Sequence, residues 1–271
     1  MAIREIDFEV DGVRVHAYEG GSGFPILMIH GSGPGASTMG NYRLVLEPLA
    51  SNYHVLAVDL IGFGLSGQKQ AEPFFDMDLW RRQTRVALGR LGSGPCGVIG
   101  HSLSGALALQ LAGAEPRVRK VMTTGAIGRS FKLNRYLEAG WTFPETKDDL
   151  RRVASSIVHD ASLITDAFLD ARMKVLHSNN YADYFRRMFS GDKQRFIEAA
   201  AIPEADLAAL DCDVLMLHGR NDLPVPAEAT SLPMSRAIPR ADVMVIARCS
   251  HSIALEHPDK FLAAARLLFG H

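Results

Sequence analysis

Cysteine is scarce in this chain, which has only Cys96, Cys212 and Cys249 among its 271 residues. So small and odd-numbered a set is typical of a reducing compartment and cannot build a disulfide framework. No cysteines or histidines recur at the spacing of a zinc site, so we predict no metal and no other cofactor. These features favour a cytoplasmic protein.

Long apolar runs and an excess of charge of one sign are also missing. No stretch reaches the roughly 18 apolar residues of a membrane-spanning helix. Residues 1–7 include three charged side chains and start no apolar region, so we expect no secretory signal peptide. Lys and Arg number 29 against 30 Asp and Glu, a formal net charge of −1. Without a basic block, neither a nucleic acid nor an anionic membrane is an expected partner.

What the chain does have is the composition of a globular protein, with 47% apolar and 22% charged residues. Residues 3–10 and 13–18 alternate apolar and polar around Asp11-Gly12, which predicts a β-hairpin. Buried strands are predicted at 26–29, 55–58, 98–99, 118–123, 213–217 and 243–246, and helices at 42–50, 79–91, 103–111 and 259–269. This alternation predicts an α/β fold with a mostly parallel, doubly wound sheet and the hairpin at one edge.

The alternation of strands and helices stops between residues 128 and 207. Helical patterns fill this stretch, at 148–159, 162–177, 181–189 and 195–201. We therefore expect a core made of residues 1–127 and 208–271, with a helical cap of residues 128–207 inserted after the sixth strand. Such an insertion suggests a lid over the carboxyl edge of the sheet, where open α/β sheets bind ligands.

The segment from Cys96 to Ala112 carries the strongest chemical signal. A short apolar strand, a sharp turn at Ser102 and a helix follow one another, which is the layout of a nucleophile elbow. Small residues must flank the turn because the strand and helix backbones approach closely. Gly100 meets this need, whereas Ser104 stands where a second glycine is usual and Gly105 follows it. The alternative is a small residue at a tight crossover.

A nucleophilic serine needs a base and an acid that orients the base. Asp222 follows the strand ending at Leu217, and His251 follows the strand ending at Ile246. Both come after carboxyl ends of strands, as Ser102 does, and their chain order suits this kind of elbow. Asp222 could instead serve a turn before Pro224, and His251 could be a helix-capping surface residue.

Such a site also needs backbone N–H groups to stabilise an oxyanion. We expect one from Leu103, at the start of the elbow helix, and others from Ser32 and Gly33 in the glycine-rich loop 31–35. This loop lacks the Gly-Lys-Ser/Thr that completes a phosphate-binding P-loop.

Arg172 shares a helix face with the apolar stripe of Phe168, Leu169, Met173 and Leu176. An arginine on an inward-facing stripe needs an anion. The spacing leaves three alternatives open: a bound ligand, an ion pair with an internal carboxylate, or a side chain that reaches out to solvent.

These residues resemble the α/β-hydrolases, and more narrowly the meta-cleavage-product hydrolases of aromatic degradation. The narrower likeness rests on the motif H-G-S-G-P-G-A-S at 30–37 followed by Asn41. Further support comes from the motifs at 54–59, 62–66, 163–166 and 218–222, and from His251 ahead of Glu256-His257. The likeness covers nearly the whole chain.

The resemblance implies the hydrolysis of a carbon–carbon bond in a 2-hydroxy-6-oxo-hexa-2,4-dienoate, a vinylogous 1,5-diketone acid. The products would be a 2-hydroxypentadienoate and a carboxylic acid. The enol is first ketonised, and the ketone is then attacked. Ser102, Asp222 and His251 would be the triad, and Asn41 and Arg172 would hold the carboxylate end. The resemblance also implies a homodimer or a larger homo-oligomer, and the apolar insert suggests a substrate with an apolar tail.

Three positions depart from the family pattern. His101 replaces the usual asparagine before the nucleophile, Ser252 replaces the tryptophan after the triad histidine, and Ser104 replaces the second elbow glycine. His101 and Ser252 would line the polar end of the pocket, where a protonated His101 could bind a carboxylate. The alternatives are an esterase or amidase that uses the same triad, and a ligand receptor on a hydrolase scaffold. A dehalogenase or epoxide hydrolase is disfavoured because those enzymes carry aspartate at the position of Ser102.

Overall fold

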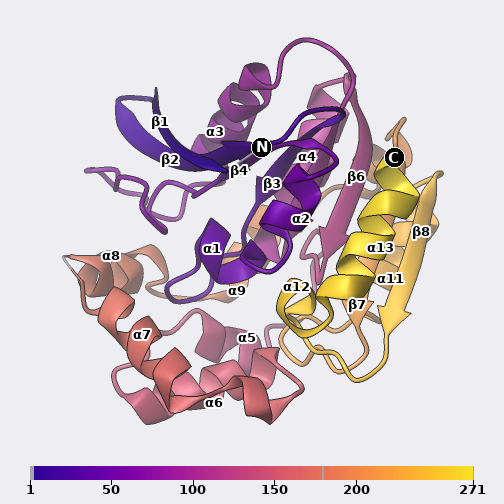
Figure 1. Cartoon of the computed structure of the whole chain (residues 1–271). Coiled ribbons are helices and arrows are strands. Elements are labelled where there is room, and N and C mark those ends of the chain that lie inside the picture. Colours follow the sequence, from indigo (N-terminus) through magenta and orange to yellow (C-terminus); the bar gives the residue numbers. More distant parts are fainter. Residues whose placement is uncertain (1–2, 179, 271) are drawn as a thin grey trace.

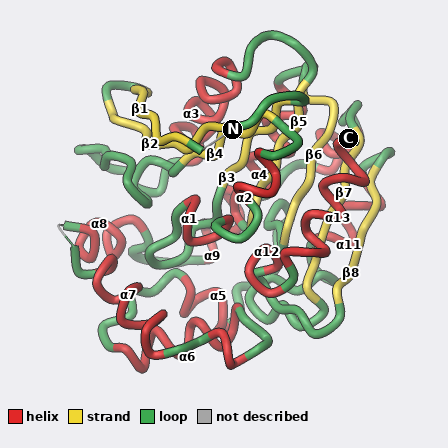
Figure 2. The backbone as a smooth tube through the Cα atoms, viewed as in Figure 1, coloured by secondary structure: helices red, strands yellow, loops and turns green. Residues whose placement is uncertain are grey.

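The computed structural model describes residues 3–178 and 180–270 and is built around one sheet of eight strands in the order β1-β2-β4-β3-β5-β6-β7-β8 (Figures 1 and 2). The strands are β1 (Arg4–Val10), β2 (Val13–Gly20), β3 (Pro25–Ile29), β4 (His54–Val58), β5 (Cys96–His101), β6 (Val118–Thr124), β7 (Asp213–Gly219) and β8 (Ala241–Ile246). The first two strands pair antiparallel, and β2 joins β4 antiparallel. All other pairings are parallel. The predicted α/β fold and edge hairpin are confirmed.

The central strands are buried on both faces because helices cover both sides of the sheet. Leu27 and Ile29 of β3 point into one core, and their neighbours Ile26 and Met28 point into the other. The first core is covered by α3 (Met77–Arg90) and α4 (Leu103–Ala114). The second is covered by α1 (Thr38–Tyr42), α2 (Leu46–Ala50), α12 (Ile253–Glu256) and α13 (Pro258–Phe269). Such two-sided burial explains the continuous apolar runs.

Between β6 and β7, the described residues form seven helical elements. They are α5 (Arg135–Gly140), α6 (Lys147–Ile157), the 3₁₀ turn η1 (Ala161–Leu163), α7 (Asp166–Leu176), α8 (Tyr181–Met188), α9 (Gln194–Ala200) and α10 (Glu204–Ala208). Figure 1 shows α5 to α8 beyond the end of the sheet at which β6 and β7 finish. An aromatic cluster of Trp141, Phe185, Phe189 and Phe196 joins this segment internally.

Several predicted helix boundaries are wrong. The helix expected at 42–50 is two short helices, α1 and α2. The helix expected at 162–177 is broken after η1, because the Thr165 side chain accepts a hydrogen bond from Phe168 N and starts α7 there. Sequence reasoning missed α5, α10, α11 (Ser231–Ala237) and α12. In the described part of the chain, no helix combines the length and apolar character needed to cross a membrane.

Candidate active site

Ser102 occupies a strained turn between β5 and α4. Its φ of 58° and ψ of −123° are unusual for a residue with a side chain. The turn is fixed from several directions: Ser102 N donates to Thr124 O, and Ser102 O accepts from Gly105 N and Ile127 N. Strain that the surrounding bonds maintain is typical of functional positions.

Close packing around the turn explains its small residues. A Cβ on Gly100 would lie 2.2 Å from Ser104 O, and one on Gly105 would lie 2.4 Å from Ala126 Cβ. On the helix side of the turn, the position that requires glycine is therefore Gly105. Ser104 is tolerated one position earlier, where its hydroxyl donates to His30 O at the end of β3. That bond connects the elbow helix to the start of loop 31–35.

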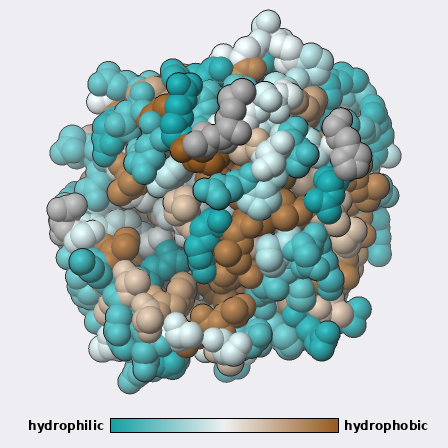
Figure 3. Space-filling model, in the orientation of Figure 1, coloured by the Kyte–Doolittle hydropathy of each residue, from teal (hydrophilic) through white to brown (hydrophobic). Residues whose placement is uncertain are grey.

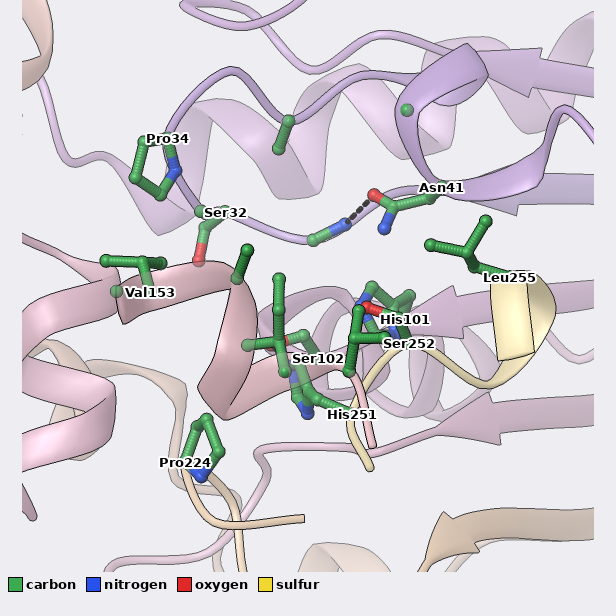
Figure 4. A pocket seen from close by; sticks show the side chains of 18 of the residues that line it. Ser32, Pro34, Asn41, His101, Ser102, Val153, Pro224, His251, Ser252 and Leu255 are labelled. Carbon is green, nitrogen blue, oxygen red and sulfur yellow. Dashed lines mark hydrogen bonds between the residues drawn. The ribbon is translucent and has the colours of Figure 1, made fainter. Parts of the chain in front are cut away.

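The structure brings Ser102, His251 and Asp222 into one hydrogen-bonded chain. His251 Nε2 lies 2.9 Å from Ser102 Oγ, and His251 Nδ1 lies 2.7 Å from Asp222 Oδ2. The carboxylate can only accept, so Nδ1 carries the hydrogen and Nε2 is free to accept from the serine hydroxyl. All three residues are buried. Figure 4 shows Ser102 and His251 side by side in the pocket.

Asp222 is held as a carboxylate by its neighbours. Burial raises the pKa of this carboxyl, but the charge of His251 and hydrogen bonds from His218 and His251 outweigh burial and leave the pKa well below its usual range. Asp222 Oδ1 also accepts a hydrogen bond from Val225 N at 2.9 Å, so Asp222 stabilises the turn at residues 222–225 as well. A stable negative charge here favours a protonated His251 once a proton is transferred.

Two residues that sequence reasoning missed support this pair. His218 Nε2 lies 2.6 Å from Val225 O and 3.3 Å from Asp222 Oδ2. Its N–H therefore donates to Val225 O and points close to the Asp222 carboxylate. Gly125, with a φ of 53°, has no room for a side chain, because a Cβ would lie 2.8 Å from His251 Nδ1 and 2.9 Å from Asp222 Oδ2. Gly125 follows β6 directly. A glycine at the carboxyl end of a central strand was the sequence feature that could have identified this position.

A cavity of about 100 Å³ opens above the serine. Among its lining residues are all the expected substrate contacts and the expected oxyanion loop: Ser32, Gly33, Asn41, His101, Arg172 and Ser252. Its remaining wall is largely apolar and comes from the segment between β6 and β7, including Leu137, Trp141, Val153, Ala154, Ile157 and Phe168. One cavity thus joins a polar end, the reactive serine and an apolar end.

The residues expected to supply backbone N–H groups for an oxyanion either follow Ser102 directly or line the same cavity. Leu103 is the first residue of α4, so its N–H has no partner within the helix. Loop 31–35 faces it across the cavity, where Trp141 Nε1 donates to Ser32 Oγ at 3.1 Å. Gly31 N is already used, because it donates to Asn41 Oδ1 at 3.2 Å. This leaves the N–H groups of Ser32 and Gly33 as the loop's candidates.

Arg172 brings a positive charge to the polar end. Its Nη1 donates to Gly35 O, and its guanidinium lies 5.8 Å from the centre of the Phe168 ring. Burial lowers the pKa of this arginine, and within residues 3–178 and 180–270 no carboxylate forms an ion pair with it. An ion pair with an internal acid, one of the three alternatives, is therefore not what the described residues show. A partly buried cation without a counter-ion is suited to bind an anion.

His101 is not the cation that we expected it could be. Burial, followed by the nearby His251, lowers the pKa of His101 to about 3, so the ring is neutral near pH 7. Its Nδ1 lies 3.0 Å from Thr124 O and 2.9 Å from Thr124 Oγ1. This neutral ring does not support the suggestion that a protonated His101 binds a carboxylate.

Comparison with known proteins places this geometry among hydrolases. The model described as "Alpha/beta hydrolase family" matches residues 26–265. A 2-hydroxymuconate semialdehyde hydrolase of Pseudomonas sp. (strain CF600) is 34% identical over 92% of this chain and 88% of that protein. A 2-hydroxy-6-oxo-2,4-heptadienoate hydrolase of Pseudomonas putida (strain F1) is 31% identical over 93% of this chain and 91% of that protein. Among solved structures, the meta-cleavage product hydrolase CumD of Pseudomonas fluorescens IP01, complexed with acetates, superposes with a TM-score of 0.91 at 29% identity, covering 97% of each chain.

Proposed function

This chain belongs to the α/β-hydrolase family and, within it, to the hydrolases of meta-cleavage products, and from that premise we propose how its residues act. The protein is a hydrolase of 2-hydroxy-6-oxo-2,4-dienoates, and we assign the reaction to Ser102, His251 and Asp222. The enol first shifts its proton from the C2 hydroxyl to C5, which leaves a ketone at C2 and a ketone at C6. We assign these proton transfers to His251. Its Nδ1 is bonded to Asp222, and its Nε2, which can accept and donate a proton, lies beside Ser102 in the cavity.

Bond cleavage then follows from the geometry of the triad. His251 Nε2 removes the Ser102 proton as Oγ attacks C6, and Asp222 stabilises the imidazolium that forms. The C5–C6 bond breaks, and its electrons return through C3 and C4 to the C2 oxygen, which is protonated to give a 2-hydroxypentadienoate. Water then releases the acyl group from Ser102 as a carboxylic acid. The N–H groups of Leu103, Ser32 and Gly33 are the donors for the oxygen on C6.

The polar end of the cavity holds the C1 carboxylate. Arg172 supplies the charge. Asn41 supplies an amide N–H, since its Oδ1 is turned to Gly31 N. The observation that carries this assignment is Arg172, which forms no ion pair with a carboxylate of residues 3–178 and 180–270 and lines the same cavity as Ser102 and His251. An esterase for neutral substrates has no use for a partly buried cation at this place.

The decisive experiment compares substrates directly. The purified protein is mixed with 2-hydroxy-6-oxohepta-2,4-dienoate and, separately, with p-nitrophenyl acetate, and loss of the dienoate colour is followed against release of nitrophenol. We expect rapid dienoate turnover. Ester hydrolysis without turnover of any dienoate would reject the carbon–carbon hydrolase and leave the esterase alternative.

We infer a short, uncharged substituent on C6. The far wall of the cavity is formed by Leu137, Trp141, Val153, Ile157 and Pro224, and the cavity has a small volume of about 100 Å³. A second carboxylate at this end would be desolvated without a partner, which is costly. The heptadienoate should therefore be preferred over 2-hydroxy-6-oxononadienedioate, and equal kcat/KM for the two would contradict this inference.

We also propose that residues 128–207 act as the cap over this cavity, and that the protein is a cytoplasmic homodimer or larger homo-oligomer. The three unpaired, buried cysteines support a reducing compartment.

Strand β8 ends the sheet, and Leu267 of α13 is 72% exposed. Figure 3 shows apolar residues at the surface around α13, a region suited to contact a second copy. Sedimentation of the protein as a monomer at micromolar concentration would reject the oligomer.

A further inference from the structure

The loop that carries His251 is bonded to the rest of the molecule on both sides of that residue. Ser250 N donates to Glu256 Oε1 at 2.8 Å, and Ser252 N donates to Ile157 O at 3.0 Å. Figure 4 shows this loop passing from His251 through Ser252 toward a short helix, which is α12. The two backbone N–H groups that flank the triad histidine are thus both bonded to residues outside the loop.

Glu256 connects this loop to the end of α6. Its second oxygen, Oε2, accepts from His159 N at 2.6 Å and lies 3.4 Å from Asp160 N, and both of these residues come shortly after α6. In the part of the chain that the structure describes, no lysine, arginine or histidine forms an ion pair with Glu256. Backbone N–H groups are therefore the partners of this carboxylate, and hydrogen bonds to a charged acceptor are stronger than those to a neutral one.

The hydroxyl of Ser250 connects the same segments. Ser250 is buried, and its Oγ lies 3.0 Å from Ser156 O of α6 and 3.0 Å from Asn221 O. Asn221 precedes Asp222, so this hydroxyl lies between the loop of the triad acid and the loop of the triad base. Helix α6 in turn forms part of the cavity wall. The end of α6, the Asp222 loop and the His251 loop are therefore held together at one place.

The sheet alone does not fix the position of His251. Strand β8 ends at Ile246, and Arg248, with a φ of 53°, turns the chain before the histidine. The 2.9 Å contact between His251 Nε2 and Ser102 Oγ consequently depends on how the loop is held. A displacement of about 1 Å in a reacting group can slow a reaction about 100-fold.

We propose, on the basis of the triad assigned above, that Glu256 is a positioning residue, which bonds the His251 loop to the end of α6 and so holds the imidazole against Ser102. Because the same bonds reach α6, His251 is also fixed relative to the cavity wall against which the substrate packs. Glu256 is not among the described residues that line the cavity. Its loss should therefore slow the reaction and leave binding of the substrate carboxylate by Arg172 and Asn41 unchanged.

The test compares two reactions that both need Ser102 and His251, the hydrolysis of 2-hydroxy-6-oxohepta-2,4-dienoate and that of p-nitrophenyl acetate. Glu256→Ala should lower kcat for both by about 10- to 100-fold, with KM for the dienoate within about threefold of wild type. Glu256→Gln keeps one acceptor oxygen and should restore part of the loss. Asp76→Asn is the matched control, because Asp76 also accepts a backbone N–H, from Leu79, at the start of α3. It should lower the unfolding midpoint and keep both kcat values near those of the wild type.

Equal kcat values in the wild type and Glu256→Ala, for whichever compound the wild type hydrolyses, would overturn the positioning role, and so would a loss confined to KM. Where Glu256→Ala does not fold, Glu256→Gln decides by the same comparison. Ester hydrolysis that depends on Glu256, without turnover of the dienoate, supports the positioning role and rejects only the carbon–carbon hydrolase. A wild type that hydrolyses neither compound rejects the triad and the role of Glu256 with it.

Discussion

Ser102 combines a strained backbone with a reactive side chain, and these two properties can be separated. Ser102→Ala keeps a Cβ at a φ of 58° and removes only the hydroxyl that bonds to His251. We expect kcat for the dienoate to fall by at least about 1,000-fold while the unfolding midpoint changes little. Stopped-flow or steady-state absorbance measures the first, and thermal unfolding the second.

Ser104→Ala is the matched control two residues away. It removes a buried hydroxyl that donates to His30 O, which should cost about 1 kcal/mol of stability. Because Ser104 does not touch the cavity, activity should stay within about tenfold of wild type. A Ser102→Ala protein as active as Ser104→Ala would remove the serine from the mechanism.

The charge of Arg172 should contribute to binding of the anionic substrate and not to the rate of the chemical step. Arg172→Gln keeps a donor near Gly35 O but loses the cation, so we expect KM for the dienoate to rise about 10- to 100-fold, the value of a charged hydrogen bond. Hydrolysis of neutral p-nitrophenyl acetate should change by less than about twofold. The control is Arg152→Gln, an exposed arginine of α6 whose side chain pairs with Asp149. Equal losses on both substrates would indicate that Arg172 only supports the fold.

At the scale of elements, α7 positions Arg172 and depends on its first turn. Thr165 caps this helix by accepting from Phe168 N, so Thr165→Ala should destabilise it by about 1 kcal/mol. We expect a lower unfolding midpoint together with a higher dienoate KM, since Arg172 lies two turns along the same helix. Ser155→Ala, which removes an exposed hydroxyl bonded within α6, should change neither value. An unchanged midpoint in Thr165→Ala would show that the cap contributes nothing to this helix.

The sequence predicted the elements whose pattern is local. Runs such as 26–29 and 55–58 are buried on both faces of the sheet and predicted β3 and β4 correctly. Residues placed directly after strands, such as Ser102, could likewise be located from position alone. The break between η1 and α7 was missed because the apolar spacing continues across Thr165, whose capping bond is not part of that pattern.

Contacts between distant elements could not be predicted in the same way. Gly125 leaves room for His251 and Asp222, which are 126 and 97 residues away by number, and no local pattern encodes such a clearance. The lowered pKa of His101 could not be predicted either, because it depends on burial beneath the turn and on His251, which comes from a distant part of the chain. Packing between elements decides both.

For the whole molecule, buried neutral histidines connect the site to the stability of the fold. His30 Nδ1 lies 2.6 Å from Gly31 O, while its Nε2 accepts from Leu60 N at 2.9 Å, so a second ring proton would break a bond. Burial lowers the pKa of His30 below its ordinary value of 6.5, and burial lowers that of His101 to about 3. In the unfolded chain both rings bind a proton near pH 6.5, so the unfolded state binds more protons than the folded state below that pH.

The sign follows from this difference in proton binding. Stability is highest above about pH 6.5 and falls as the pH drops toward 4.5, by up to about 1.4 kcal/mol per pH unit for each histidine. His101→Asn removes one of the two, so its free energy of unfolding in urea should fall less steeply than that of the wild type over that range. His159→Asn, a change at an exposed histidine, should keep the wild-type slope. Identical slopes in the wild type and His101→Asn would mean that burial does not lower the pKa of His101 in the folded protein.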